Sequence, residues 1–168
     1  MAGFATSELS DALIDRSLMR SMLHVVPATD ATEWRPLFAA MMLSQFLSTH
    51  RRKVEWVDLA ELEQLGRRAL KSGPKSFASL GAALSTHWPK SDPASLGTAV
   101  RTVVPLVQIP SYGVWNAVAP PTHVPLETWV GRTVEAAPAG LETLVLRGLE
   151  AWGPASAKTF KPGAGFAG

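Results

Sequence analysis

The sequence predicts an α+β, mostly helical fold of tandem units, each a helix-turn-helix followed by a β-hairpin. Three helical patterns lie between residues 58 and 104, and a stretch typical of a hairpin follows them directly. Helix, helix, helix, hairpin is the order of a winged-helix domain, in which the hairpin is the wing. Part of this pattern recurs after residue 140, which indicates more than one copy of the unit.

The composition excludes several classes of protein. The chain has 168 residues, of which 46% are hydrophobic, enough for a packed core in one ordinary domain or two small ones. No apolar run is long enough to span a membrane, and the N-terminus does not resemble a signal peptide. The absence of cysteine excludes disulfides and cysteine zinc sites, and it fits the cytoplasmic location that we expect. The net charge is only +2, so charge alone does not indicate nucleic-acid binding.

The chain begins with a predicted helix and an extended segment. Residues 7–16 have the apolar spacing of a short helix, and residues 18–26 read as extended up to Pro27. A lone strand is not a stable unit. We therefore expect this segment to pair with a strand further along the chain or with one that is missing.

A long amphipathic helix is predicted next. Asp30 and Glu33 have the spacing of a capping box, so we expect the helix to begin at Asp30. Its apolar face runs to Phe46, and Pro36 lies in its first turns, where proline kinks a helix. The basic run 51–53 is interpreted as a solvated helix end, because cations suit the C-terminal end of a helix dipole.

Three shorter helices precede the hairpin. Asp58, Ser76 and Asp92 are predicted N-caps, and Pro105 ends the third helix. The hairpin itself is predicted from two β-type runs, 106–109 and 114–118, on either side of a turn at 110–113. Two tryptophans in and after the hairpin, Trp115 and Trp129, are expected in the core.

The C-terminal stretch repeats part of the central unit. Four residues recur 80 positions later, Arg67, Gly73, Pro74 and Ser76 as Arg147, Gly153, Pro154 and Ser156. The sequence therefore predicts three parts. Residues 1–53 are the end of a first winged-helix unit with its connecting helix, 54–135 a complete unit, and 136–168 the start of a third. We accordingly expect the chain to be a fragment of a longer protein.

Several phrases occur in an order that resembles one family. They are Leu18-Met-Arg-Ser-Met-Leu-His-Val-Val26, Arg67-Arg-Ala-Leu70, Leu106-Val-Gln-Ile-Pro110, Gly113-Val-Trp115 and Trp129-Val-Gly131. Over residues 6–156 their order and spacing resemble the bacterial winged-helix DNA-binding-domain-containing proteins. That group includes DNA glycosylases similar to AlkZ, which unhook interstrand crosslinks. The resemblance implies three tandem winged helices in full-length members and double-stranded DNA as the partner.

Catalytic residues are not expected in this chain. The family's Gln-x-Gln or Gln-x-Asp motif lies upstream of the phrase that begins at Leu18, and neither form occurs in the sequence. Three aspartates are explained as helix caps, and the other two, Asp11 and Asp15, are expected to face solvent. The histidines lack zinc-type spacing. We expect no cofactor and no metal, and whether any enzyme activity remains is left open.

Six residues are the predicted DNA contacts: Arg20, His24, Lys75, Ser76, Arg101 and Tyr112. The resemblance places His24 near the DNA groove, although a structural hydrogen bond would also explain it. Arg20 is a phosphate contact or a surface ion pair. Lys75 and Ser76 begin a helix, where a phosphate can bind, or Ser76 is simply its cap.

The remaining two predicted contacts lie on the third helix and the wing. The solvent side of that helix is expected to carry Ser95, Thr98, Arg101 and Thr102, of which Arg101 can read guanine or brace the wing. Tyr112 stands in the wing turn where the family usually has an arginine, so one phosphate contact is lost. It could wedge into a minor groove, although an exposed turn tyrosine is commoner.

The sequence thus favours a monomer that binds duplex DNA through backbone contacts, as part of a protein similar to DNA-repair glycosylases that act on crosslinked or alkylated DNA. Two alternatives stay open. A transcriptional regulator that reads a site as a dimer is disfavoured by the few base-reading residues on the third helix. A non-catalytic protein-interaction module is favoured by the near-neutral charge.

Overall fold

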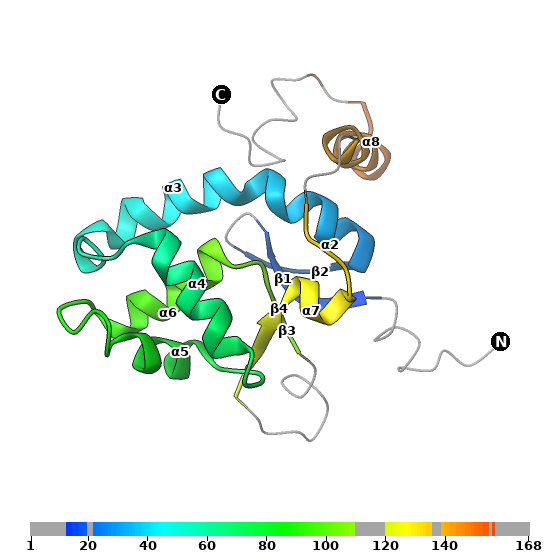
Figure 1. Ribbon diagram of the computed structural model, residues 1–168. Coiled ribbons are helices and arrows are strands. Elements are labelled where there is room, and N and C mark those ends of the chain that lie inside the picture. Colours follow the sequence, from blue (N-terminus) through cyan, green and yellow to red (C-terminus); the bar gives the residue numbers. More distant parts are fainter. Residues whose placement is uncertain (1–12, 20–21, 110–119, 136–138, 155, 157–168) are drawn as a thin grey trace.

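The computed structural model describes residues 13–19, 22–109, 120–135, 139–154 and 156, with side chains from Val26 onward except Trp152. Helices surround a small antiparallel sheet, so the expected mostly helical α+β class is confirmed (Figure 1). In Figure 1 the long helix α3 crosses above α4, α5 and α6, and α8 stands beside α2.

The sheet has four strands in the order β2-β1-β3-β4. They are β1 (Leu13–Met19), β2 (Met22–Pro27), β3 (Leu106–Gln108) and β4 (His123–Pro125). β1 and β2 form an antiparallel hairpin, and Ser17 of β1 pairs with Val107 of β3. The described residues of the segment that was expected to be extended, 18–26, therefore belong to two strands, β1 and β2. Both strands find their partners within the chain.

The helix expected over residues 7–16 was wrong for its described part, because residues 13–16 lie in β1. Helical spacing over ten residues is a weak signal, since so short a helix is marginal without tertiary contacts. Pairing with β2 and β3 instead provides backbone hydrogen bonds on both sides of the segment. Residues 7–12 lie outside the described residues.

Of the hairpin expected after the third helix, the structure describes the first strand, β3, which pairs with β4. Leu106 pairs with Pro125, and Gln108 pairs with His123. The second strand is thus not the expected run 114–118, which lies outside the described residues, as does Tyr112. β4 is fixed from outside the hairpin as well, because the segment before α5 bridges it.

The N-terminal helical region is broken, as Pro36 suggested. It consists of α2 (Ala28–Trp34), the 3-10 turn η1 (Arg35–Phe38), α3 (Ala39–His50) and the 3-10 turn η2 (Arg51–Lys53). The predicted start at Asp30 was wrong, because α2 begins at Ala28 and Asp30 makes no cap. Asp30 is instead buried and forms an ion pair with Arg147 of α8. Burial raises the pKa of Asp30, and the charge of Arg147 opposes that effect.

The three central helices are capped as predicted. They are α4 (Leu59–Leu70), α5 (Phe77–Leu84) and α6 (Pro93–Val103). The carboxylate of Asp58 accepts a hydrogen bond from the amide of Ala60 at 2.8 Å, and Asp92 accepts one from the amide of Ser95 at 3.0 Å. Two further helices follow β4, α7 (Leu126–Val130) and α8 (Gly140–Trp152). On α7, Trp129 is 44% exposed, so its predicted core position was wrong.

The repeated segments each contain a glycine with a positive φ. Gly73, just after α4, has a φ of 121°, and Gly153, just after α8, has a φ of 81°. Both values lie in the region that glycine adopts far more readily than other residues. The repeat in sequence thus places a positive-φ glycine after each of the two helices, while the predicted boundaries between the three parts stay a prediction.

α5 and α6 approach each other closely because glycine stands at the contact on each helix. A Cβ on Gly81 would overlap the carbonyl oxygen of Pro93, and one on Gly97 would overlap that of Phe77. The core beside this contact includes Leu80 and Leu96, which have no exposed surface.

We expect Gly81→Ala to lower the free energy of unfolding by about 1–3 kcal/mol, because the added methyl group would force the two backbones apart. Urea unfolding measures this change, with Ala82→Ser on the exposed side of α5 as control. At an ordinary helix position the same substitution stabilises a protein, by up to about 1 kcal/mol. A stabilised Gly81→Ala variant would therefore contradict the close approach.

Candidate nucleic-acid interface

The start of α5 and the base of the β3–β4 hairpin lie together. Lys75 and His123 exchange both backbone hydrogen bonds, with N···O distances of 3.1 Å and 2.9 Å. This bridge holds the first turn of α5 against β4. We call the residues that meet there the foot cluster: Lys75, Ser76, Phe77, Arg101, Gln108 and His123.

The ring of Phe77 connects a cation of α6 with the imidazole of β4. His123 stacks on Phe77 with ring centroids 3.9 Å apart and an interplanar angle of 22°. The guanidinium carbon of Arg101 lies 5.4 Å from the centroid of the same ring. An aromatic face attracts a cation at this distance. Arg101 is therefore held at the foot cluster rather than free in solvent.

Arg101 carries a charge that is not neutralised within the described part of the chain. Its side chain is partly buried, and burial lowers its pKa. The ion pairs of the described residues include neither Arg101 nor Lys75. Desolvating a charge without a partner costs free energy, which a bound anion would offset. The foot cluster is thus suited to a phosphate group.

His123 is neutral at physiological pH. It is 3% exposed, and its pKa is lowered to about 4, mainly by burial and also by the charge of Arg101. Its Nδ1 atom is enclosed without a hydrogen-bond partner, and so is the Nε2 atom of Gln108, its neighbour across the strands. Two buried polar atoms at the base of the hairpin therefore have unused hydrogen-bonding capacity within the described residues, and the one on His123 belongs to a ring that feels the charge of Arg101.

The structure brings together three of the six predicted contacts. Lys75, Ser76 and Arg101 all belong to the foot cluster. Ser76 also serves as the cap of α5, since its hydroxyl oxygen accepts a hydrogen bond from the amide of Ser79 at 3.2 Å. His24 lies in β2, separated from β4 by β1 and β3, and its side chain is not described. The other two contacts, Arg20 and Tyr112, lie outside the described residues.

The expectation that α6 presents four polar residues to solvent was wrong for two of them. Ser95 is 1% exposed and donates a hydrogen bond to Asp92 at 2.6 Å. Thr102 is 6% exposed, and its hydroxyl donates to the carbonyl of Thr98 at 3.0 Å. Each hydroxyl has a hydrogen-bond partner in the helix or its cap, so it can be buried without losing its hydrogen bond. Thr98 and Arg101 stay partly exposed.

A hollow of about 260 Å³ lies where α3 runs past α6. Its polar lining includes Thr49 and His50 from α3 and Thr98 and Arg101 from α6. Arg101 therefore borders both this hollow and the foot cluster. Sequence patterns did not indicate the hollow or the Phe77–His123 stack, because both join segments far apart in the chain.

The described residues form neither a metal centre nor a membrane-spanning helix. In that part of the chain, no group of three or more histidine and carboxylate side chains is placed to hold a metal ion. Nor does any described helix have the length and apolar content needed to cross a bilayer.

We expect the stability contributed by His123 to be lost as the pH falls from about 6.5 toward 4. The unfolded state binds the proton at about pH 6.5, whereas the folded state resists it down to a pH of about 4. In that window the unfolded state holds more protons, so stability falls with falling pH. Urea midpoints of the wild type and His123→Gln across this range should converge toward acid. Parallel curves would show that His123 is not protected from protonation.

The comparisons with known proteins agree with the resemblance of the sequence phrases. The model of the family described as DNA glycosylase AlkZ-like matches residues 1–167. No curated protein and no solved structure matches the chain. The family match covers almost the whole sequence and implies DNA as the partner. The chain belongs to the AlkZ-like DNA glycosylase family.

Proposed function

We propose that this chain binds duplex DNA through contacts to the phosphate backbone, as part of a DNA-repair glycosylase that acts on crosslinked or alkylated DNA. The unit that makes the contact is a winged helix composed of α4, α5, α6 and the β3–β4 hairpin. Its element order supports this assignment. We keep the predicted division into parts 1–53, 54–135 and 136–168 as part of the proposal.

The convergence of Lys75, Ser76 and Arg101 at the foot cluster is the observation that carries the proposal. Two of these side chains are cations without an ion-pair partner among the described residues. The third caps α5, and backbone amides at a helix start favour an anion. Because the chain belongs to a DNA glycosylase family, we infer that this anion is a phosphate of DNA.

The burial of polar side chains on α6 favours contact with the phosphate backbone of DNA over recognition of the base edges. Ser95 and Thr102 are buried, so Thr98 and Arg101 are the polar side chains that α6 could offer a DNA groove. Direct base reading needs several hydrogen-bonding side chains along one helix face. This favours the backbone binder over the sequence-specific dimeric regulator, and we infer a monomer acting in the bacterial cytoplasm.

We expect Lys75→Gln and Arg101→Gln each to weaken duplex binding roughly uniformly across sequences. Each should also reduce the slope of log K against log salt by about one, because one phosphate contact is lost. Fluorescence anisotropy with a short duplex at roughly 50–200 mM salt measures both quantities. Arg68→Gln removes the same charge from the exposed side of α4 and serves as the matched control.

The alternative is the protein-interaction module that the near-neutral charge favours. A folded wild-type chain without duplex binding at low salt would support it. Equal losses in Arg68→Gln and Arg101→Gln would also count against a specific role of the foot cluster, because net charge alone would then explain the binding.

A further inference from the structure

The corner between α3 and α4 carries an exposed aromatic ring beside Lys90, and a run of three cations precedes that ring by a few residues in the chain. We call this set the corner patch: Arg51, Arg52, Lys53, Trp56 and Lys90. Trp56 is 69% exposed, the largest fraction among the exposed large apolar side chains that the structure describes. The ammonium nitrogen of Lys90 lies 5.9 Å from the centroid of its ring. Most of the ring surface is therefore accessible, with positive charge beside it.

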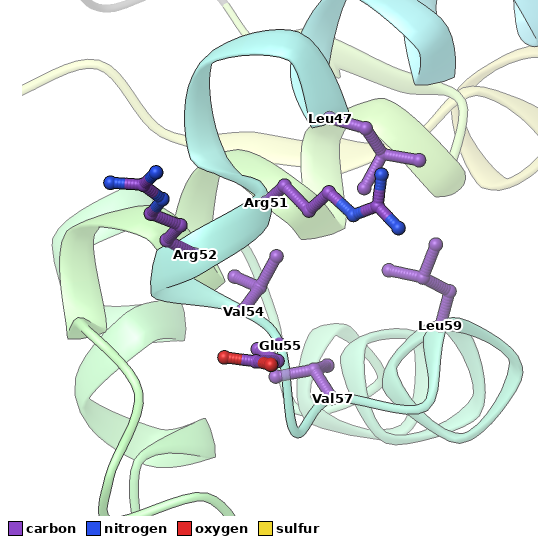
Figure 2. A pocket seen from close by; sticks show the side chains of 7 residues that line it. All are labelled: Leu47, Arg51, Arg52, Val54, Glu55, Val57 and Leu59. Atoms are coloured by element: carbon purple, nitrogen blue, oxygen red, sulfur yellow. The ribbon is translucent and has the colours of Figure 1, made fainter.

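Two hollows border the cations of this corner. One has a volume of about 630 Å³ and is shown in Figure 2 with its seven lining residues. Arg51 and Arg52 extend from the η2 turn in opposite directions in that view. The second hollow, of about 800 Å³, is also lined by both arginines and adds Lys53 and the hydroxyls of Ser44 and Ser48. The surface is thus indented beside cations and hydroxyls, the groups that bind phosphate oxygens.

The cations of the corner patch form few ion pairs and hydrogen bonds with other residues in the described part of the chain. Neither Arg51 nor Arg52 makes an ion pair there, and neither donates a side-chain hydrogen bond to a carbonyl at the end of α3. Lys53 reaches Asp92 at 4.0 Å, while the Asp92 carboxylate is already bound to Ser95. The three cations are exposed at the C-terminal end of α3, as expected of a solvated helix end, and they are accessible to a ligand there.

We propose that the corner patch binds a single-stranded nucleic-acid segment, with one base stacked on Trp56 and the flanking phosphates on Arg51, Arg52 and Lys53. Stacking on an exposed aromatic ring combined with backbone cations is how proteins hold unpaired strands. A paired duplex keeps its bases stacked on one another, so it would leave Trp56 without a partner. Glu55, the acidic side chain in the lining of the hollow in Figure 2, makes the patch less attractive to a purely electrostatic ligand.

This site consists of residues outside the foot cluster and does not depend on the proposed duplex contact. The corner patch is formed by the segment between α3 and α4 and by Lys90, which precedes α6. The foot cluster is formed by the start of α5, the C-terminal part of α6 and the hairpin strands. Two probes, one single-stranded and one duplex, can therefore test the two sites separately.

The test is anisotropy with a fluorescent oligothymidine of about 12 nucleotides, within the range of site sizes of single-strand binders. We expect Trp56→Ala to weaken binding about 5- to 100-fold through loss of one base stack. The double variant Arg51→Gln/Arg52→Gln should reduce the slope of log K against log salt by about 1.4, the value for two lost contacts to a single strand.

Two matched controls separate the patch from general effects. Trp129→Ala removes the other tryptophan described as exposed, and Arg68→Gln/Lys71→Gln removes the same charge from the end of α4 and its C-cap. Both should keep the wild-type affinity for oligothymidine within about twofold, well under one lost base stack. Because Trp56 and both arginines are exposed, all variants should keep the wild-type circular dichroism and urea midpoint.

Several results would overturn the proposal. The first is a wild-type protein that fails to bind oligothymidine. The second is that Trp56→Ala and Trp129→Ala bind oligothymidine with equal affinity. Competition by polyglutamate as effective as by unlabelled oligothymidine would identify a surface for acidic proteins instead. Lys75→Gln and Arg101→Gln should weaken duplex binding but keep oligothymidine binding. If they weakened binding of both probes equally, one surface would serve both probes and a separate site would be refuted.

Discussion

The buried guanidinium of Arg35 is the contact on which the arrangement of the helices depends. Arg35 is 2% exposed and donates a hydrogen bond to the carbonyl oxygen of Thr102, at 2.7 Å, near the end of α6. Burial lowers its pKa to about 10, so it is charged at neutral pH. A buried charge that lost this partner would be strongly destabilising. The η1 turn is therefore fixed against α6, and α3, which follows it directly, passes across α6 (Figure 1).

That arrangement decides which surface is available for function. With α3 across it, α6 leaves Thr98 and Arg101 partly exposed, and the glycine contacts between α5 and α6 bring Phe77 close to α6. The side chain of Arg101 then lies over the Phe77 ring, next to the bridge between Lys75 and β4. The same packing that stabilises the core thus gathers cations at the base of the hairpin, in a protein of a DNA glycosylase family.

Sequence reasoning succeeded where the decisive interaction is local. Asp58, Ser76 and Asp92 are N-caps because each bonds an amide two or three residues away. It failed at Asp30, whose partner is Arg147 on a distant helix, and at β1, whose strand identity comes from pairing. For the candidate site it predicted Lys75, Ser76 and Arg101. It could not predict the Phe77–His123 stack or the covered face of α6, because both depend on how distant segments pack.

The most direct measurement is a map of amide chemical shifts as a short duplex is added to isotopically labelled protein. If the foot cluster contacts the DNA backbone, the largest changes will fall at Lys75, Ser76 and Phe77 and at Arg101. The covered residues Ser95 and Thr102 should change little, because α3 and the interior of the fold shield them. Changes centred on α8, or spread evenly over the exposed lysines and arginines, would contradict the account and show that the foot cluster is not the interface.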